Sequence, residues 1–151
     1  MNGEYLRELS EIAPYIIDTS LEITSSVVLG TSGTETETIS RKVFLLSCTE
    51  VGISDAVNIA HEGNELDYFK DEVNRKAYLD GKPSSWWLRT PNTYYRSCTY
   101  VIGDNNKLGF TNAYDENGMR PAFCVKGDLP IELKDDVVDD LEVYTFSFER
   151  N

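Results

Sequence analysis

Two short motifs decide the expected fold of this chain: Trp-Trp-Leu-Arg-Thr-Pro at residues 86–91 and Gly-Met-Arg-Pro-Ala-Phe at residues 118–123. Large aromatic side chains dominate the energetics of protein cores, so we interpret Trp86 and Trp87 as anchors of a core and its sheet. Because adjacent residues of a strand point to opposite faces, at most one of the two rings can be central to a given core. The motifs therefore predict two rigid boundaries for the segment between them.

Each motif also contains an arginine close to a proline. We interpret Arg89 and Arg120 as structural guanidinium groups that satisfy backbone carbonyls or a buried carboxylate, a task that suits their fixed fork of donors. Pro121 has no N–H to donate to a neighbouring strand. We therefore expect its strand at a sheet edge or at a bulge.

The segment between the motifs is polar and aromatic, with few large aliphatic side chains. Tyrosine offers a large contact area at low entropic cost, and Asn, Ser and Thr supply adaptable hydrogen bonds. We therefore predict that residues 92–117 display a ligand-binding surface. The residues expected to contact the ligand are Asn92, Thr93, Tyr94, Tyr95, Arg96, Ser97, Thr99, Tyr100, Asn105, Asn106, Asn112 and Tyr114.

Composition excludes some classes of partner. The chain has 151 residues and a formal charge of −12, which disfavours a nucleic-acid partner because phosphate contacts need clustered Lys and Arg. No stretch approaches the ~18 apolar residues of a membrane span, and no signal peptide is expected at the N-terminus. Neither the compartment nor the oligomeric state follows from the sequence, so an oligomer remains open.

The residues that could carry chemistry are few. The three cysteines, Cys48, Cys98 and Cys124, form no CxxC pair, and we expect small buried thiols in a chain made under reducing conditions. The one histidine, His61, lies in a loop without pattern and is expected at the surface. No His or Cys spacing typical of zinc is present. We therefore expect neither a catalytic site nor a metal.

No cofactor is expected, and calcium is the one ion that the sequence leaves open. Asp104-Asn-Asn and Asp115-Glu-Asn-Gly118 could offer oxygen ligands. Neither matches an ordered calcium loop, and turns commonly have this composition.

The pattern of apolar residues predicts a single α+β domain, with two helices packed on a small, mostly antiparallel, irregular β-sheet. Helical spacing indicates helices over about 2–12 and 64–79. Residues 21–29 and 42–47 are typical of strands, and 30–40 of a mobile loop or hairpin tip. Ser47 and Glu50 have the spacing of a capping box. Further strands are expected at 86–89, 97–102, 107–112, 120–125 and 142–148, with a tight turn at 103–106.

Within this single domain we expect three parts. Residues 1–40 would hold the first helix, a strand and the loop, and residues 41–126 the motif-bearing core. Residues 127–151 would hold an acidic connection, with the run 135–142 exposed to solvent, and the last strand.

These motifs resemble those of an uncharacterised domain family of gut bacteria and their phages, which looks like Trp-Trp-Leu-Arg-Ser/Thr-Pro followed by Gly-Val-Arg-Pro-Ala. The resemblance covers roughly residues 40–126. It implies a C-type-lectin-like fold, similar to that of the formylglycine-generating enzyme and of the variable proteins of diversity-generating retroelements. In such folds the segment between the motifs faces solvent and holds the ligand.

Three hypotheses about function follow. The first is a receptor-recognition module, not an enzyme, that displays residues 92–117 to a protein or glycan ligand on a phage virion or a cell surface. By resemblance it would be a retroelement-diversified adhesin, although ordinary hairpin loops favour the same residues. The second is a structural phage or cell-surface component without a ligand. The third, an enzyme of the formylglycine-generating type, needs a cysteine pair, and Cys98 and Cys124 do not obviously align with one.

Overall fold

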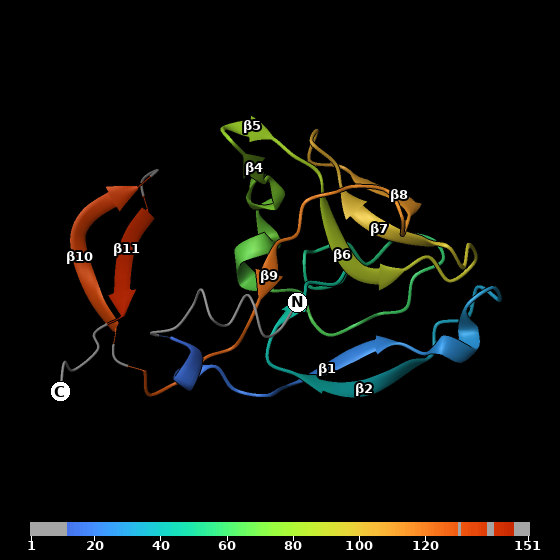
Figure 1. The fold of residues 1–151 in the computed structure, drawn as a ribbon, viewed down its shortest axis with the longest axis horizontal. Coiled ribbons are helices and arrows are strands. Elements are labelled where there is room, and N and C mark those ends of the chain that lie inside the picture. Colours follow the sequence, from blue (N-terminus) through green and yellow to red (C-terminus); the bar gives the residue numbers. More distant parts are fainter. Residues whose placement is uncertain (1–11, 130, 139–140, 147–151) are drawn as a thin grey trace. The chain divides into compact units, whose positions relative to one another are not determined.

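The computed structural model describes residues 12–129, 131–138 and 141–146 of the chain (Figure 1). The described residues belong to two compact units. The central unit is Asp18–Phe123, and the terminal unit contains the described residues on either side of it. The boundary before Cys124 lies close to residue 126, where we expect the motif-bearing core to end.

The terminal unit brings together two parts of the chain that are far apart in sequence. Pro14 lies in a single 3-10 turn, η1 (Ala13–Tyr15). The residue after this turn, Ile16, forms an antiparallel bridge with Val125. The helix expected over residues 2–12 falls outside the described residues except for its last position.

The terminal unit also contains a two-stranded antiparallel sheet of β10 (Ile131–Val138) and β11 (Leu141–Phe146). The last expected strand, at 142–148, is confirmed over its described part. The acidic run 135–142, expected as a connection, belongs largely to strands, because β10 and β11 both extend into it. Its β-branched valines favour a strand, and a partner strand satisfies their backbone groups.

The central unit consists of short strands and 3-10 turns (Figure 1). Four two- or three-stranded antiparallel sheets contain all of its described strands. In chain order its elements are β1 (Thr19–Thr24), η2 (Ser26–Val28), β2 (Thr36–Arg41), β3 (Phe44–Leu45), η3 (Asp67–Lys70), η4 (Glu72–Arg75), β4 (Tyr78–Leu79), β5 (Lys82–Pro83), β6 (Trp86–Pro91), β7 (Cys98–Ile102), β8 (Leu108–Asn112) and β9 (Pro121–Ala122).

The largest sheet is β6-β7-β8, and it positions most of the segment between the two motifs. The hairpin turn expected between β7 and β8 is confirmed: Gly103 N–H donates to the Lys107 carbonyl at 2.8 Å, and Asn106 adopts a positive φ of 66°. Asn tolerates this left-handed conformation better than most residues with a Cβ. The sequence therefore predicts this hairpin correctly, while the register, in which Ile102 pairs with Leu108, comes from the structure.

The β1–β2 hairpin was expected only in part. We interpret residues 30–40 as a loop or hairpin tip, but β2 begins at Thr36 and pairs with β1 along its whole length. This strand shows no hydrophobic periodicity, because Thr36 and Thr38 alternate with glutamates and few of its residues are apolar. Its residues are largely exposed, so pairing with β1 rather than burial determines its structure.

The expected fold class, a C-type-lectin-like α+β domain with two packed helices, is wrong for the described residues. The segment expected as a helix over 64–79 contains two 3-10 turns, η3 and η4, and the short strand β4. Asp71 between the turns is extended, with φ −89° and ψ 116°, and its carboxylate accepts the Val73 N–H. Of the apolar face, Phe69 is buried, but Leu66 and Val73 are exposed. A helix this short is stable only when its apolar face is packed.

The core of the central unit lies between the β6-β7-β8 sheet and the loops before it. Along β6, burial alternates, with Trp86, Leu88 and Thr90 inside. Trp86 is therefore the central ring and Trp87 is only partly buried, as the alternation of side chains along a strand requires. The apolar residues of the core cluster are Leu46, Cys48, Val51, Ile53, Ile59, Phe69, Trp86, Leu88, Tyr100 and Ile102.

Candidate functional site

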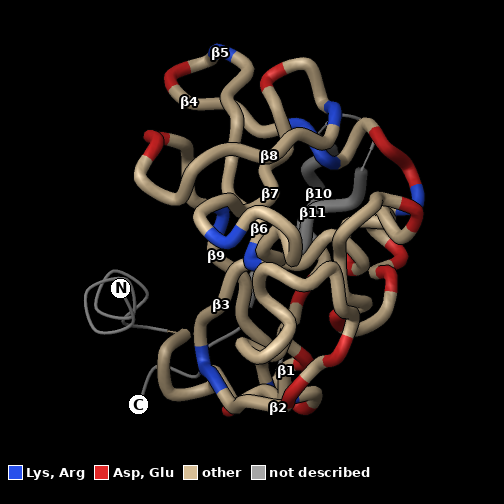
Figure 2. The backbone as a smooth tube through the Cα atoms, turned by 90° about the vertical axis from the view of Figure 1, so that its right-hand side faces the viewer, with Lys and Arg blue, Asp and Glu red and all other residues tan. Residues whose placement is uncertain are grey.

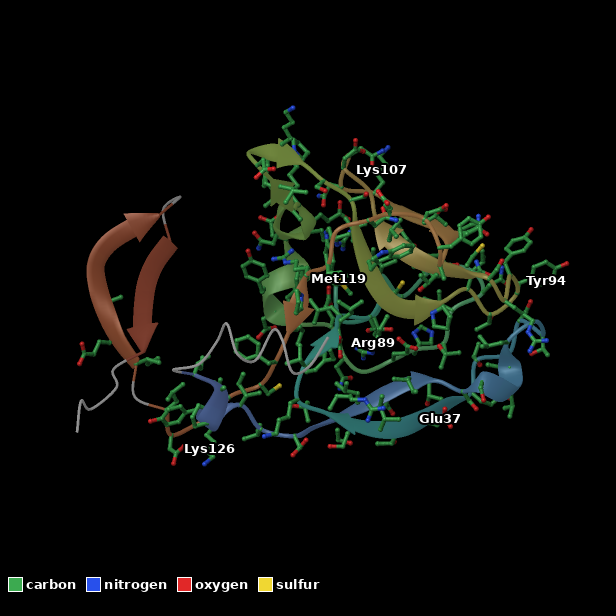
Figure 3. The ribbon with its side chains drawn as sticks, viewed as in Figure 1. Glu37, Arg89, Tyr94, Lys107, Met119 and Lys126 are labelled. Carbon is green, nitrogen blue, oxygen red and sulfur yellow. The ribbon has the colours of Figure 1, made fainter. Side chains whose placement is uncertain are left out.

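An exposed cluster of aromatic rings lies at one end of the β6-β7-β8 sheet, and we call Tyr94, Tyr95 and Phe110 the aromatic patch. These residues are 55%, 50% and 50% exposed. The rings of Tyr94 and Tyr95 meet edge to face at 4.9 Å, and Tyr95 stacks on Phe110 at 5.8 Å with 19° between the ring planes. Tyr94 points away from the strands (Figure 3). The patch therefore offers a ligand apolar ring faces beside hydroxyl groups.

A buried asparagine holds the backbone beneath the patch. The Oδ1 of Asn92 accepts the N–H groups of Tyr94 at 3.1 Å and of Tyr95 at 2.9 Å. Its Nδ2 donates to the Tyr100 hydroxyl at 3.1 Å, and that hydroxyl donates to the Val57 carbonyl at 2.6 Å. Burial raises the pKa of Tyr100, so the hydroxyl remains a donor. The loop is thus ordered before any ligand arrives, which lowers the entropic cost of binding.

Three residues expected to contact a ligand lie in the interior instead. Asn92, Thr93 and Tyr100 are buried, so their expected place on an exposed surface is wrong. The Thr93 N–H donates to the Asn58 carbonyl at 2.9 Å, and its own carbonyl accepts the Gly30 N–H. The backbone groups of Thr93 are thus satisfied within the fold, while its buried Oγ1 has no hydrogen-bond partner among the described residues. These residues therefore stabilise the loop that carries the aromatic patch and do not themselves face solvent.

Three other predicted residues do reach the surface at the same end as the patch. Arg96, Ser97 and Tyr114 are exposed, and Tyr114 is 81% exposed. A backbone hydrogen bond of 2.8 Å from Ala113 N–H to the Ser97 carbonyl joins the two loops. The structure therefore brings Tyr94–Ser97 and Tyr114 to one end of the sheet.

The remaining predicted residues lie elsewhere. Thr99 and Asn112 are partly buried, and Thr99 Oγ1 donates to the Thr90 carbonyl at 2.8 Å. Asn105 and Asn106 belong to the turn at the opposite end of the β7–β8 hairpin, where Asn106 Nδ2 donates to the Glu72 carbonyl. The predicted set is thus split between the two ends of one hairpin.

Phe110 is the patch residue that the sequence interpretation missed. It lies in a strand of ordinary composition, and it pairs directly with Tyr100 of β7. The hydrogen bond from Gly103 N–H to the Lys107 carbonyl closes the hairpin one residue later than the expected 103–106 turn, and this register places Phe110 opposite Tyr100. Counting from the expected turn would have placed Gly109 there, so the sequence did not identify Phe110.

A buried ion-pair network lies beneath the sheet. Arg89 binds Glu50 with both terminal nitrogens, at 2.6 Å and 2.8 Å, and also donates to the Leu45 carbonyl at 2.9 Å. Figure 3 shows Arg89 between β6 and β1. The expectation that Arg89 satisfies carbonyls or a buried carboxylate is confirmed. A bidentate arginine–carboxylate pair adds geometric specificity as well as energy.

The second carboxylate of this network, Glu62, is fully buried. It accepts the N–H and the hydroxyl of Thr24 at 2.6 Å and 2.7 Å and the hydroxyl of Thr90 at 2.7 Å. Its Oε2 lies 3.6 Å from Arg89 Nε. One carboxylate therefore joins β1, β6 and the loop before η3. No sequence pattern singles out Glu62.

Glu50 has a sequence signal. Ser47 N–H donates to Glu50 Oε2 at 3.0 Å, and Glu50 N–H donates to Ser47 Oγ at 3.0 Å. The expected capping box is confirmed. It orients Glu50 toward Arg89.

The buried thiol of Cys48 adjoins this network. Burial raises the pKa of Cys48 from 9.0 to about 12. Because the thiolate is the reactive form of cysteine, Cys48 is inert at neutral pH. Cys48 therefore agrees with the expectation of small buried thiols, whereas Cys98 and Cys124 are only half-buried.

Comparison with known proteins identifies the family of this chain. A model for a domain of unknown function, DUF6273, matches residues 1–127. The chain belongs to the DUF6273 family. No curated protein and no solved structure matches the chain.

The second motif arginine of this DUF6273 domain is also structural. Arg120 Nη1 donates to the Asn74 carbonyl at 3.1 Å, and its guanidinium lies over the rings of Phe69 and Trp86 at 5.2 Å and 5.1 Å. Its neighbour Pro121 lies in β9, which pairs with β3 alone, so the expected edge position is confirmed.

Within the described part of the DUF6273 domain, no three His, Cys, Asp or Glu side chains lie close enough together to hold a metal. Asp115, one of the oxygen donors considered for calcium, instead accepts the Asn112 N–H and the Thr111 hydroxyl. The described helical turns include none with the length and apolar character of a membrane span. His61 is exposed, as expected.

Proposed function

We propose that this DUF6273 domain is a ligand-binding module and that the aromatic patch contacts a protein or glycan ligand. The observation that carries the proposal is a set of three half-exposed rings in mutual contact, on a loop whose backbone is held by the buried Asn92. Contiguous exposed apolar surface on a soluble domain is typical of an interaction site.

The chemistry of the patch suits recognition. Tyrosine side chains lose little conformational entropy on binding and supply both ring faces and hydroxyl groups. Arg96 follows Tyr95 in sequence and is exposed, and its side chain lies close to Gly30. Such a surface can stack against the apolar face of a sugar or receive the side chains of a protein loop.

The burial of Asn92, Thr93 and Tyr100 limits how this surface can vary. If the segment 92–117 is diversified by a retroelement, we propose that tolerated substitutions gather at the exposed positions 94–97 and 114. Sequencing the gene from a population grown from one isolate tests this. Substitutions at adenine positions of those codons support diversification, and an invariant segment leaves a binder of fixed specificity.

Substitution of the patch tests ligand binding directly. The wild type, Tyr94→Ala and Tyr95→Ala would be applied to a glycan array and to a library of displayed peptides. We expect each substitution to weaken binding by a factor of about 10 to 30, as removal of an aromatic hot spot does. Tyr68→Ala is the matched control, because Tyr68 is 52% exposed and lies in η3, outside the patch.

Melting temperatures separate binding from folding. The two patch variants should melt with the wild type, since about half of each side chain is already in water. Patch variants that fold and bind every selected ligand as well as the wild type does would contradict the proposal.

A further inference from the structure

A second candidate site lies away from the aromatic patch, in a groove beside the β4–β5 hairpin of the central unit. The groove has a volume of about 380 Å³, at the lower end of the range for small-molecule sites. Its walls come from the segment Lys76–Leu79, from Ser84–Trp86 and from Gly118–Arg120. Met119 lies on the side of β6 that faces the η4–β4 segment (Figure 3).

Large apolar side chains remain exposed around this groove. Tyr78, Leu79 and Met119 are 62%, 64% and 53% exposed. Trp86 forms part of the floor and is fixed there, since its Nε1 donates to the Arg75 carbonyl at 2.8 Å. A ligand with an aromatic or aliphatic body would remove these side chains from water.

The charged residues in the wall are both cations. Lys76 and Arg120 line the groove, and no acidic residue does. Among the described residues, the one hydrogen-bond acceptor for the Arg120 guanidinium is the Asn74 carbonyl, and no carboxylate pairs with either cation. Stacking on Phe69 and Trp86 fixes the plane of this guanidinium. A fixed plane with free donors suits bidentate binding of a carboxylate.

No acidic residue among those described lines the groove, although Asp80 lies in the nearby turn between β4 and β5. The chain carries a net charge of −12, and its acid-rich β1–β2 hairpin lies at the opposite end of the central unit from β4 and β5 (Figure 2). Nearby Glu72 pairs with Arg75. Exposed charges farther apart than about 10 Å are largely screened at 0.1 M salt, so the groove keeps its local preference for anions.

We propose that this groove binds a small carboxylate-bearing ligand, with its carboxylate on Arg120 and Lys76 and its apolar body against the exposed Tyr78, Leu79 and Met119. The site is independent of the aromatic patch.

The first experiment uses 3-phenylpropionate as the probe and 3-phenylpropionamide as its uncharged match. The chain has two methionines, and Met119 lines the groove. With methyl-labelled methionine, NMR titration of the full chain follows Met119 directly, with Met1 as an internal reference. We expect the carboxylate to shift the Met119 methyl with a Kd on the order of 1 mM. The amide should bind at least about ten times more weakly.

Substitutions test which groups bind the carboxylate. Lys76→Gln should weaken 3-phenylpropionate several-fold, and Arg120→Gln should abolish the Met119 shift. Lys107→Gln removes an exposed cation from the β7–β8 turn, outside the groove (Figure 3), and should leave the affinity unchanged.

A salt titration covers the case in which Arg120→Gln fails to fold. Because dissolved ions screen the attraction between the carboxylate and the two cations, the wild type should bind 3-phenylpropionate more weakly as NaCl rises from about 20 to about 300 mM. Lys76→Gln should show a smaller loss over the same range. An affinity that does not change with salt, in a protein whose Lys76→Gln variant binds as the wild type does, would contradict the proposal.

Equal binding of the carboxylate and the amide would overturn the assignment of the ligand's charge. The absence of a Met119 shift would overturn the site itself. Tyr94→Ala should leave the 3-phenylpropionate titration unchanged. The proposal for the groove and the proposal for the aromatic patch can therefore be contradicted separately.

Discussion

The buried carboxylate of Glu62 gives the sharpest test of how the central unit is held together. In Glu62→Gln the side chain keeps its shape but loses its charge and one acceptor atom. The wild-type carboxylate accepts three short hydrogen bonds, two from Thr24 and one from Thr90, and faces Arg89 Nε at 3.6 Å. The amide can keep the two bonds from Thr24, but its NH₂ group then faces the Thr90 hydroxyl.

The expected cost follows from these contacts. Hydrogen bonds to a charged group contribute about 1.5–3 kcal/mol each, and bonds between neutral groups about 1 kcal/mol. Loss of charge from two bonds, at about 0.5–2 kcal/mol each, and of the bond from Thr90, at about 1.5–3 kcal/mol, would lower the free energy of unfolding by about 2.5–7 kcal/mol. Removal of a buried charge offsets part of this, because Arg89 keeps its pair with Glu50, and we expect a net loss of about 2–3 kcal/mol. The melting temperature should fall by roughly 10 °C.

Urea unfolding followed by tryptophan fluorescence measures this change, because Trp86 is 1% exposed in the native state. Glu37→Gln is the matched control: it also removes one carboxylate, but Glu37 is exposed on β2 (Figure 3). Its free energy of unfolding should stay within about 0.5 kcal/mol of the wild type. If Glu62→Gln unfolds at the same urea concentration as Glu37→Gln, the network does not stabilise the fold as argued.

Two further predictions concern buried residues. Asn92→Ala should lower the free energy of unfolding by about 2–4 kcal/mol, because it leaves the Tyr94 and Tyr95 N–H groups without their acceptor; urea unfolding checks this, and a loss below about 0.5 kcal/mol would contradict the role of Asn92. Because the pKa of Cys48 rises from 9.0 to about 12 on folding, the native state binds more protons above pH 9, and stability should fall between pH 9 and 12 by up to about 1.4 kcal/mol per pH unit. Unfolding of the wild type and of Cys48→Ala at several pH values measures this contribution, and equal slopes would show that Cys48 does not cause it.

Patterns of local origin were predicted well. The β7–β8 hairpin follows from turn residues that accept a positive φ, and the Ser47–Glu50 capping box follows from spacing alone. The alternation along residues 86–91 correctly limits the core to one of the two tryptophans. Each of these depends on residues within a few positions of one another in the chain.

Patterns that depend on tertiary partners were predicted poorly. The spacing of Leu66, Phe69 and Val73 indicates a helix, but the fold buries only Phe69 and the segment forms two 3-10 turns. Helical periodicity shows which residues could share a face, whereas stability requires another surface to cover that face.

For the candidate site, composition alone predicted a binding surface between the two motifs. Composition could not separate the exposed Tyr94 and Tyr95 from the buried Tyr100, because the tyrosine side chain is equally suited to a ligand-binding surface and to a core. The division between surface and support, the partner of Arg89 and the groove beside β4 and β5 were decided only by the tertiary structure. Each depends on side chains that are distant in sequence and that meet only when the chain folds.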